Sequence, residues 1–211
     1  MIWREICRYL KRYVPENSTV LDLGAGYGDL LKHLSARKKY GIEMNPLLVE
    51  EWGNEIEALV QSALDSFPLA DGFINVVFAS NFFEHFVIED CQKILGEVRR
   101  VLDASGRLIV IQPNMRLQLG RYFDDYTHKT PFTEISFSDF LESLGWGILR
   151  REARFLPFTL LRRKPRVFRP WMNAGRVPFE APKERSRVCF GGFRPTKHVE
   201  EPRALARGAP Q

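Results

Sequence analysis

A short apolar segment that runs directly into a glycine-rich turn is the feature that most restricts the fold. Residues 18–23 (STVLDL) read as a buried strand, and glycines follow at positions 24, 26 and 28. Glycine lets a chain turn sharply and lets a ligand lie against the main chain. A helix is predicted to follow over about residues 28–36, where leucines recur at helical spacing. The segment predicts a strand–turn–helix unit whose turn is either a ligand site or a simple tight turn.

Strand-like and helix-like segments alternate through the rest of residues 1–155, which predicts an α/β fold. The other predicted strands are residues 39–43, 56–60, 73–79, 107–112 and 145–155. The other predicted helices are residues 2–13, 45–52, 88–102 and 136–144, with a turn at Ser105-Gly106. Such alternation is typical of a mostly parallel sheet with helices on both faces.

The charge around the glycine turn indicates which ligand it would take. Asp22 and Asp29 flank the glycines, and Glu43 ends the next predicted strand, 19 residues after Gly24. An acid at that place can accept hydrogen bonds from both hydroxyls of a ribose, so a nucleoside is expected. Two carboxylates would repel the pyrophosphate of NAD, which needs a bare helix N-terminus. They suit a cationic ligand without phosphate, such as S-adenosylmethionine (SAM).

The chain resembles class I SAM-dependent methyltransferases over roughly residues 15–155. The resemblance rests on residues 20–31 (VLDLGAGYGDLL), 40–46 (YGIEMNP), 73–86 (FINVVFASNFFEHF) and 94–114 (ILGEVRRVLDASGRLIVIQPN). It implies a Rossmann-like, mostly parallel seven-stranded sheet, with SAM across the ends of the first two strands and S-adenosylhomocysteine (SAH) as the product. Residues 122–133 and 137–146 are similar to a subgroup of bacterial small-molecule methyltransferases, some of them associated with glycan synthesis.

By position, the resemblance also implies which residues bind the cofactor. Asp22 would lie near the methionine ammonium, Glu43 would hold the ribose, and Met44 would face the adenine or make a simple apolar contact. The full set is Asp22, Gly24, Ala25, Gly26, Gly28, Glu43, Met44, Ser62, Ala63 and Ser80. Two departures from the family pattern predict a weaker hold on adenine. Ser62 replaces the aspartate of the usual triplet, and Asn75 replaces an acid that often begins the fourth strand.

Candidate catalytic residues follow the fourth and fifth predicted strands, where an open α/β sheet places its site. Methyl transfer mainly requires positioning, although an oxygen acceptor also needs a base. Asn81, Glu84 and His85 form the first group, and the second comprises Tyr122, Asp124, Asp125, Tyr126 and His128. We predict catalytic roles for His85, His128, Asp124 and Tyr122. A structural role for His85 and a solvated loop at 122–128 are the alternatives. Glu84 and His85 are too few to predict a metal site, so no metal ligand is predicted.

The last 62 residues differ in charge from the rest of the chain. They carry 16 Lys and Arg against 5 Asp and Glu, with 8 of the 13 prolines, whereas residues 1–149 carry 15 against 21. This predicts a methyltransferase domain over residues 1–158 and a basic Pro/Arg-rich tail, 159–211, partly ordered or disordered. Within it, residues 188–193 are a poor candidate for the sheet's last strand. The tail is read as solvated chain, as a binder of nucleic acid or anionic membrane, or as out-of-frame translation.

The sequence therefore predicts an enzyme that methylates a small, hydroxylated metabolite or glycan precursor, with O-methylation favoured. The competing function is a catalytically degenerate SAM-fold protein that binds nucleic acid or a protein partner through its tail; nucleic acid is the weaker expectation. Three widely spaced cysteines argue against a disulfide framework and favour a reducing cytosol. No apolar run reaches the ~18 residues of a membrane span, and residues 1–14 lack the apolar region of a secretion signal. A cytoplasmic location is expected.

Overall fold

The computed structural model describes residues 2–155 and 188–195, and for residues 2 and 188–190 only the backbone. Seven strands form one sheet: β1 Thr19–Leu23, β2 Lys38–Glu43, β3 Ile56–Val60, β4 Ile74–Ser80, β5 Leu102–Pro113, β6 Trp146–Glu152 and β7 Val188–Pro195. Their order is β3-β2-β1-β4-β5-β7-β6. β1 to β5 pair in parallel, and β7 lies antiparallel between β5 and β6. The predicted mostly parallel, seven-stranded fold is confirmed.

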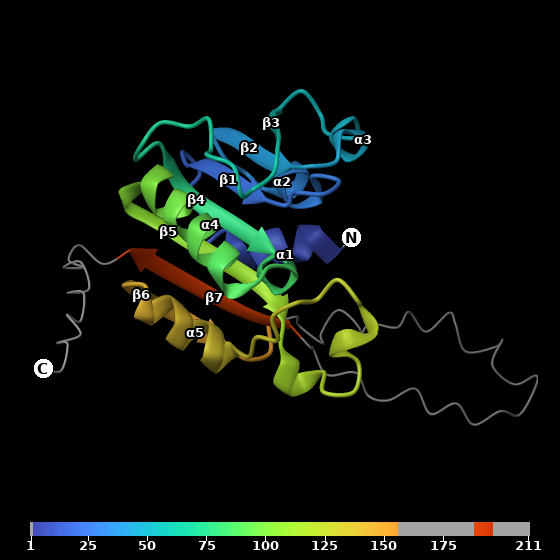
Figure 1. Ribbon diagram of the computed structural model, residues 1–211. Helices are drawn as coiled ribbons and strands as arrows, with labels where there is room; N and C mark the ends of the chain where they lie inside the picture. Colours follow the sequence, from blue (N-terminus) through green and yellow to red (C-terminus); the bar gives the residue numbers. More distant parts are fainter. Residues whose placement is uncertain (1, 156–187, 196–211) are drawn as a thin grey trace, which may run out of the picture.

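Helices cover both faces of this sheet (Figure 1). They are α1 Ile2–Leu10, α2 Asp29–His33, α3 Pro46–Val49, α4 Ile88–Val101 and α5 Glu134–Ser143, with short 3-10 turns η1 Phe83–His85, η2 Met115–Leu117 and η3 Tyr122–Asp124. Alternating strand residues supply the two cores. In β4, Val77 and Ala79 pack with α4 and α5, whereas Val76 and Phe78 pack with α1 and α2. This alternation explains why the strand is apolar throughout.

Several element bounds differ from those predicted. α2 ends at His33 because Leu34 is already extended, and α3 ends at Val49. β5 begins at Leu102, and the predicted turn at Ser105-Gly106 is instead an irregularity in its pairing with β4. The local sequence pattern therefore predicted these three elements but misplaced the ends of α2 and α3 and the start of β5.

β7 falls inside the segment that the sequence assigned to the tail. Residues 188–193 were predicted to be a poor candidate for a strand, yet they form one, and packing explains one of the glycines. A Cβ at Gly191 would lie 2.3 Å from the ring of Phe193. That ring is buried and packs against Phe137 of α5, with ring centroids 5.9 Å apart. Residues 159–187 and 196–211 of the predicted tail lie outside the described residues.

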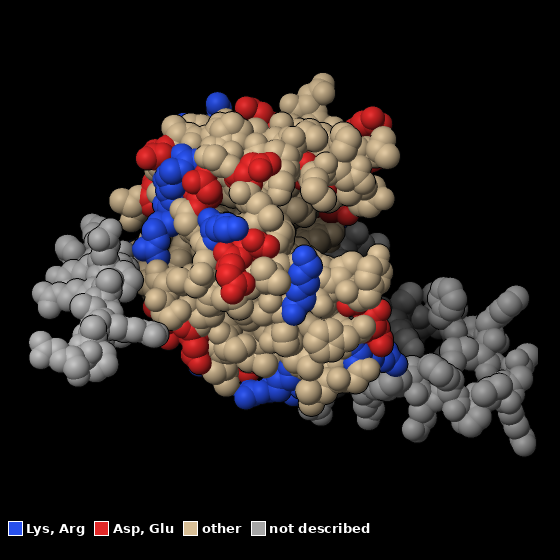
Figure 2. Space-filling view, in the orientation of Figure 1, with Lys and Arg blue, Asp and Glu red and all other residues tan. Residues whose placement is uncertain are grey.

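The parallel strands bring their carboxyl ends to one edge of the sheet, on the right in Figure 1. Leu23, Glu43, Ser80 and Pro113 end β1, β2, β4 and β5 there. Figure 2 shows a hollow in the surface at this edge, between the part that carries β1 to β3 and the loop after β5. Among the described helices, none combines the length and apolar character needed to cross a membrane.

Candidate functional site

The glycine turn forms as the sequence predicts, between the end of β1 and the start of α2. Gly24, Gly26 and Gly28 have φ angles of 63°, 54° and 71°, in the left-handed region that favours glycine. Gly28 precedes the first residue of α2. The turn is anchored to β2, because the Ala25 N–H donates to the Ile42 carbonyl at 3.1 Å.

Two aromatic side chains that the sequence analysis missed brace this turn. The Trp52 indole donates to the Gly26 carbonyl at 2.7 Å, and a Cβ at Gly28 would lie 2.9 Å from its ring. From the other side, a Cβ at Gly24 would lie 2.7 Å from the ring of Phe82. Both aromatic residues are buried. The glycines therefore allow the Trp52 and Phe82 rings to approach the main chain closely, as well as allowing a sharp turn. The spacing of the glycines in the sequence does not indicate which rings these are.

Glu43 closes the turn from the end of β2. Its Oε2 accepts a hydrogen bond from the Gly26 N–H at 3.0 Å, and its Oε1 accepts one from the Asn45 N–H at 2.9 Å. A carboxylate oxygen has two lone pairs, so each keeps acceptor capacity for a ligand hydroxyl. The two hydrogen bonds hold the carboxylate in place beside the glycine turn.

Asp22 lies inside β1 and is almost completely buried. Burial, and secondarily the negative charge of Glu43, raise its pKa to about 8. A buried carboxyl group with a raised pKa favours a ligand that brings a positive charge to it. The negative charge of Glu43 makes this edge unfavourable for a pyrophosphate, and a cation would allow the buried Asp22 to ionise.

The remaining predicted cofactor residues lie around the same edge. The Gln61 N–H donates to the Glu43 carbonyl at 3.2 Å, which places Ser62 and Ala63 beside the end of β2. The Ser62 hydroxyl accepts from the Leu64 N–H at 3.1 Å, and the Ala63 side chain is buried. Met44 is 73% exposed. The Ser80 hydroxyl is buried without a hydrogen-bond partner in the described part of the chain.

Asn75 does not bear on adenine binding as the sequence analysis expected. It lies near the start of β4, at the opposite end of the strand from Ser80. Its Oδ1 accepts from the Thr19 N–H at 2.7 Å, and its amide donates to Asp103. Asn75 therefore ties β1, β4 and the start of β5 together at the amino edge of the sheet.

A second cluster brings together residues of η1 and the loop that follows β5. The N–H groups of Lys129 and Thr130 donate to the Glu84 carbonyl at 2.7 and 3.1 Å. The rings of His85 and His128 lie 5.1 Å apart by their centroids. His85 and His128, the two predicted catalytic histidines, are 43 positions apart in the sequence. Main-chain hydrogen bonds hold the two segments that carry them against each other.

Both histidines are oriented through Nδ1. The Thr127 hydroxyl donates to Asp125 at 2.6 Å, so its oxygen, 2.9 Å from the His85 Nδ1, accepts the imidazole N–H. The His128 Nδ1 donates to the Tyr122 carbonyl at 2.7 Å. Burial, and secondarily His128, lower the pKa of His85. Main-chain hydrogen bonds with Thr127 and Asn81 oppose part of this lowering. In the neutral state, the His128 Nε2 carries an unshared lone pair, and the His85 Nε2 carries one in the tautomer that donates from Nδ1 to Thr127.

Glu84 lies beside these rings and is completely buried. Within the described residues, no donor makes a hydrogen bond of normal geometry to either carboxylate oxygen, and Oε1 is 3.9 Å from the His85 Nε2. Burial raises the pKa of Glu84 to about 8, although backbone N–H groups of residues 82 and 84 oppose part of this effect. The sequence analysis placed Glu84 at the mouth of the site without assigning it a catalytic role.

The other two predicted catalytic residues lie differently. Tyr122 is buried, and its hydroxyl donates to the Thr130 carbonyl at 2.8 Å, so it supports the loop. Asp124 is exposed. The neighbouring Asp125 is the acid that reaches Thr127 and lies 3.8 Å from the His128 Nε2. Tyr126 is 92% exposed. The structure therefore brings His85 and His128 together with Asp125 rather than with Asp124.

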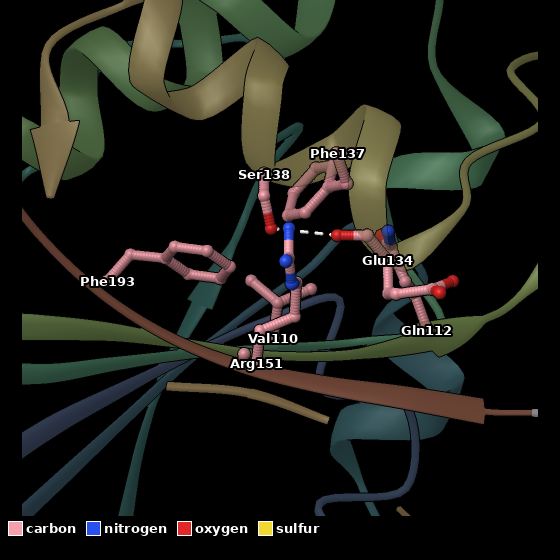
Figure 3. A pocket seen from close by; sticks show the side chains of 8 residues that line it. Val110, Gln112, Glu134, Phe137, Ser138, Arg151 and Phe193 are labelled. Carbon is pink, nitrogen blue, oxygen red and sulfur yellow. Dashed lines mark hydrogen bonds between the residues drawn. The ribbon is translucent and has the colours of Figure 1, made fainter. Parts of the chain in front are cut away.

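A small cavity lies between α5 and the strands β5 to β7 (Figure 3). Its lining includes Gln112, whose amide oxygen and nitrogen are both buried without a hydrogen-bond partner in the described residues. On the opposite side, the Ser138 hydroxyl donates to the Glu134 carbonyl at 2.8 Å. Gln112 is the last residue but one of β5, at the same sheet edge as the glycine turn, and no feature of the sequence singled it out.

Comparisons with known proteins agree with this geometry. A family profile described as a methyltransferase domain matches residues 21–110. The sarcosine/dimethylglycine N-methyltransferase of Halorhodospira halochloris is 29% identical over 177 residues, covering 68% of this chain and 62% of that protein. The demethylmenaquinone methyltransferase of Thermus thermophilus is 34% identical over 104 residues, covering 44% of this chain and 46% of that protein. The chain thus matches less than two thirds of the length of either relative.

The fold is shared with solved structures of low sequence identity. A SAM-dependent methyltransferase from Archaeoglobus fulgidus superposes with a TM-score of 0.63 at 18% identity, covering 90% of this chain and 93% of that one. The likeness covers most of both chains and concerns the fold.

Proposed function

We propose that this chain is a class I SAM-dependent methyltransferase that transfers a methyl group from SAM to a small, hydroxylated acceptor. The matched methyltransferase profile and the two relatives support this proposal. The observation that carries the proposal is the pair of carboxyl groups at the glycine turn. Asp22 is buried with a raised pKa, and Glu43 is fixed by the Gly26 N–H with acceptor capacity to spare. These groups fit a ligand that combines a ribose with positive charge.

The residues present fit SAM. Glu43 would accept hydrogen bonds from the ribose hydroxyls, and Asp22 would lie near the methionine ammonium. The main chain of Gly24 and Gly26 would pack against the ligand, because both residues already have left-handed backbone conformations. When bound, SAM supplies a methyl group on a positively charged sulfur. The protein needs to place an acceptor in line with that group, and this placement accounts for most of the catalysis it would provide.

The acceptor would lie next to Glu84, His85 and His128. Its oxygen lone pair forms the new bond to the methyl carbon, the carbon–sulfur bond breaks, and its electron pair stays on sulfur as the thioether of SAH. A hydroxyl acceptor also loses a proton. The unshared Nε2 lone pairs of the two histidines are the groups placed to promote that loss, while Asp125 and Tyr122 hold the rings in position.

A small amine is the second candidate acceptor. The relative from H. halochloris is named as a sarcosine/dimethylglycine N-methyltransferase, and an amine acceptor would use the same methyl donor and the same sheet edge. A panel that pairs hydroxylated sugars with sarcosine and dimethylglycine separates the two acceptor classes, because production of SAH reports turnover for either.

The cofactor is tested first, by calorimetric titration of the full chain with SAH and with NADH. We expect saturable SAH binding that Glu43→Ala reduces at least tenfold, and no heat from NADH. Glu57→Ala is the matched control, because Glu57 is an exposed glutamate on β3. Folded protein that binds neither ligand would reject the proposal and favour the competing role, a degenerate SAM-fold protein that acts through its basic segment.

A further inference from the structure

We propose that Glu84, His85 and His128 bind a divalent transition-metal ion, whose remaining coordination position takes the oxygen of the methyl acceptor. Each residue offers one potential ligand atom, and these atoms all lie within 4.8 Å of one another. The acceptor's place on the metal rests on the proposed function, whereas metal binding itself does not. Glu84 and His85 belong to η1, and His128 belongs to the loop after β5. The three residues therefore come together only in the folded protein.

The carboxylate is the strongest reason to expect a cation. Glu84 is completely buried, and no donor in the described part of the chain makes a hydrogen bond of normal geometry to either of its oxygens. A buried carboxylate is stable only when it is protonated, paired or bound to a metal. No described Lys or Arg forms an ion pair with Glu84. The basic group near it is the His85 imidazole, whose Nε2 lies 3.9 Å from Oε1.

The histidines are arranged as metal-binding histidines usually are. A ligating imidazole commonly donates its other N–H to a carbonyl, a carboxylate or a hydroxyl, and this bond fixes the ring and its tautomer. His85 donates from Nδ1 to the Thr127 hydroxyl, which is itself bonded to Asp125, and His128 donates from Nδ1 to the Tyr122 carbonyl. In this tautomer both Nε2 atoms face no other donor among the described residues and would bind the metal. With the ion bound, they no longer act as bases, and the ion itself would promote loss of the acceptor's proton.

The donor set and its spacing indicate the kind of metal. Two imidazole nitrogens and one carboxylate suit Zn²⁺, Fe²⁺, Co²⁺ or Mn²⁺ better than Mg²⁺ or Ca²⁺, which prefer oxygen. Bonds of about 2.0–2.2 Å would bring tetrahedral ligands to about 3.4 Å from one another, so side-chain shifts of about an ångström complete the site. Three protein ligands leave a position open, as in catalytic sites. The His85 side chain is 32% exposed, which gives the ion a way in.

The test is metal binding by the full chain, stripped with EDTA and dialysed, without any acceptor. Co²⁺ is titrated while visible absorption is recorded, and Zn²⁺ affinity is measured by competition with a chromophoric chelator. We expect one site per chain. His85→Ala, His128→Ala and Glu84→Gln are each expected to weaken Zn²⁺ binding at least 100-fold and to remove the Co²⁺ absorption band. Thr127→Val, which removes the partner of the His85 Nδ1, should weaken it about 10- to 100-fold.

His33→Ala is the matched control, because His33 lies at the end of α2, outside the cluster, and is expected to leave binding unchanged. Circular dichroism shows whether each variant is folded. An affinity that is equal in His85→Ala, His128→Ala and the native chain would overturn the inference, as would the absence of saturable binding. SAH is titrated into the same metal-free protein. SAH binding without metal binding would reject the metal site and leave the proposed function standing.

Discussion

Replacement of Asp22 by Asn should change how the stability of the unliganded protein depends on pH. Burial raises the pKa of Asp22 in the folded protein to about 8, from the value of 3.8 of an unperturbed aspartate. Between these values the folded protein keeps a proton that the unfolded chain has lost, so rising pH favours unfolding. The contribution reaches about 1.4 kcal/mol per pH unit, and on the order of 5 kcal/mol over the whole interval. Asn has no proton to lose, so this slope disappears.

Urea unfolding of both proteins at pH 5, 6, 7 and 8 measures the effect. The free energy of unfolding of Asp22→Asn minus that of the native protein should rise steadily with pH, because other titrating groups cancel in the difference. A flat difference would refute the claim that Asp22 is held protonated by burial. SAH binding gives a second measurement. If its ammonium ionises Asp22, calorimetry at pH 7 in buffers of different ionisation enthalpy should show nearly one more proton released by the native protein than by Asp22→Asn.

Three further changes test the packing behind the site. Trp52→Phe removes the hydrogen bond to the Gly26 carbonyl; it should cost about 1–2 kcal/mol in urea unfolding and weaken SAH binding in calorimetry. Gly41→Ala places a Cβ 2.4 Å from the Trp52 ring; it should cost about 1–3 kcal/mol, and less when Trp52 is already Phe. Glu97→Gln weakens the bonds to Arg100 that hold the pKa of Glu97 at about 2. It should cost about 1–2 kcal/mol at pH 7, a difference that shrinks as the pH falls below 4.5 towards 2.

The sequence was sufficient wherever a function depends on local backbone. The three left-handed glycines, the acid that ends β2 and the bounds of β3 at residues 56 and 60 agree with the prediction. Each follows from a pattern within a few residues: a glycine that must turn, an acid after an apolar strand, a short segment that begins and ends with β-branched residues. The alternation of such units also fixes the parallel sheet, since the connections leave few other topologies.

The sequence was insufficient where a contact joins distant segments. Trp52 looked like the end of a helix, and its role depends on the fit of its ring against Gly28 and Gly41. Asp124 and Asp125 could not be told apart by type, and only the fold of the loop decides that Asp125 reaches Thr127. His128 meets His85 because two N–H groups bind the Glu84 carbonyl. Such contacts follow from tertiary packing, and spacing along the chain carries no record of them.

The treatment of acidic side chains separates the two edges of the sheet. Near the amino edge, Glu97 is matched by Arg100 at 2.8 Å, so the fold neutralises that charge itself. At the carboxyl edge, Asp22 and Glu84 are buried deeper, and no described Lys or Arg forms an ion pair with either. Burying a carboxyl group in this way is unfavourable for stability. A protein that can pair its acids with arginine at one edge, and leaves two buried acids unpaired at the other, is built to receive positive charge there. Asp22 lies beside the glycine turn and Glu84 beside the histidines, so the two charges would come from different ligands. SAH and the metal ion should therefore each stabilise the folded chain without the other, by an amount set by its own concentration and affinity.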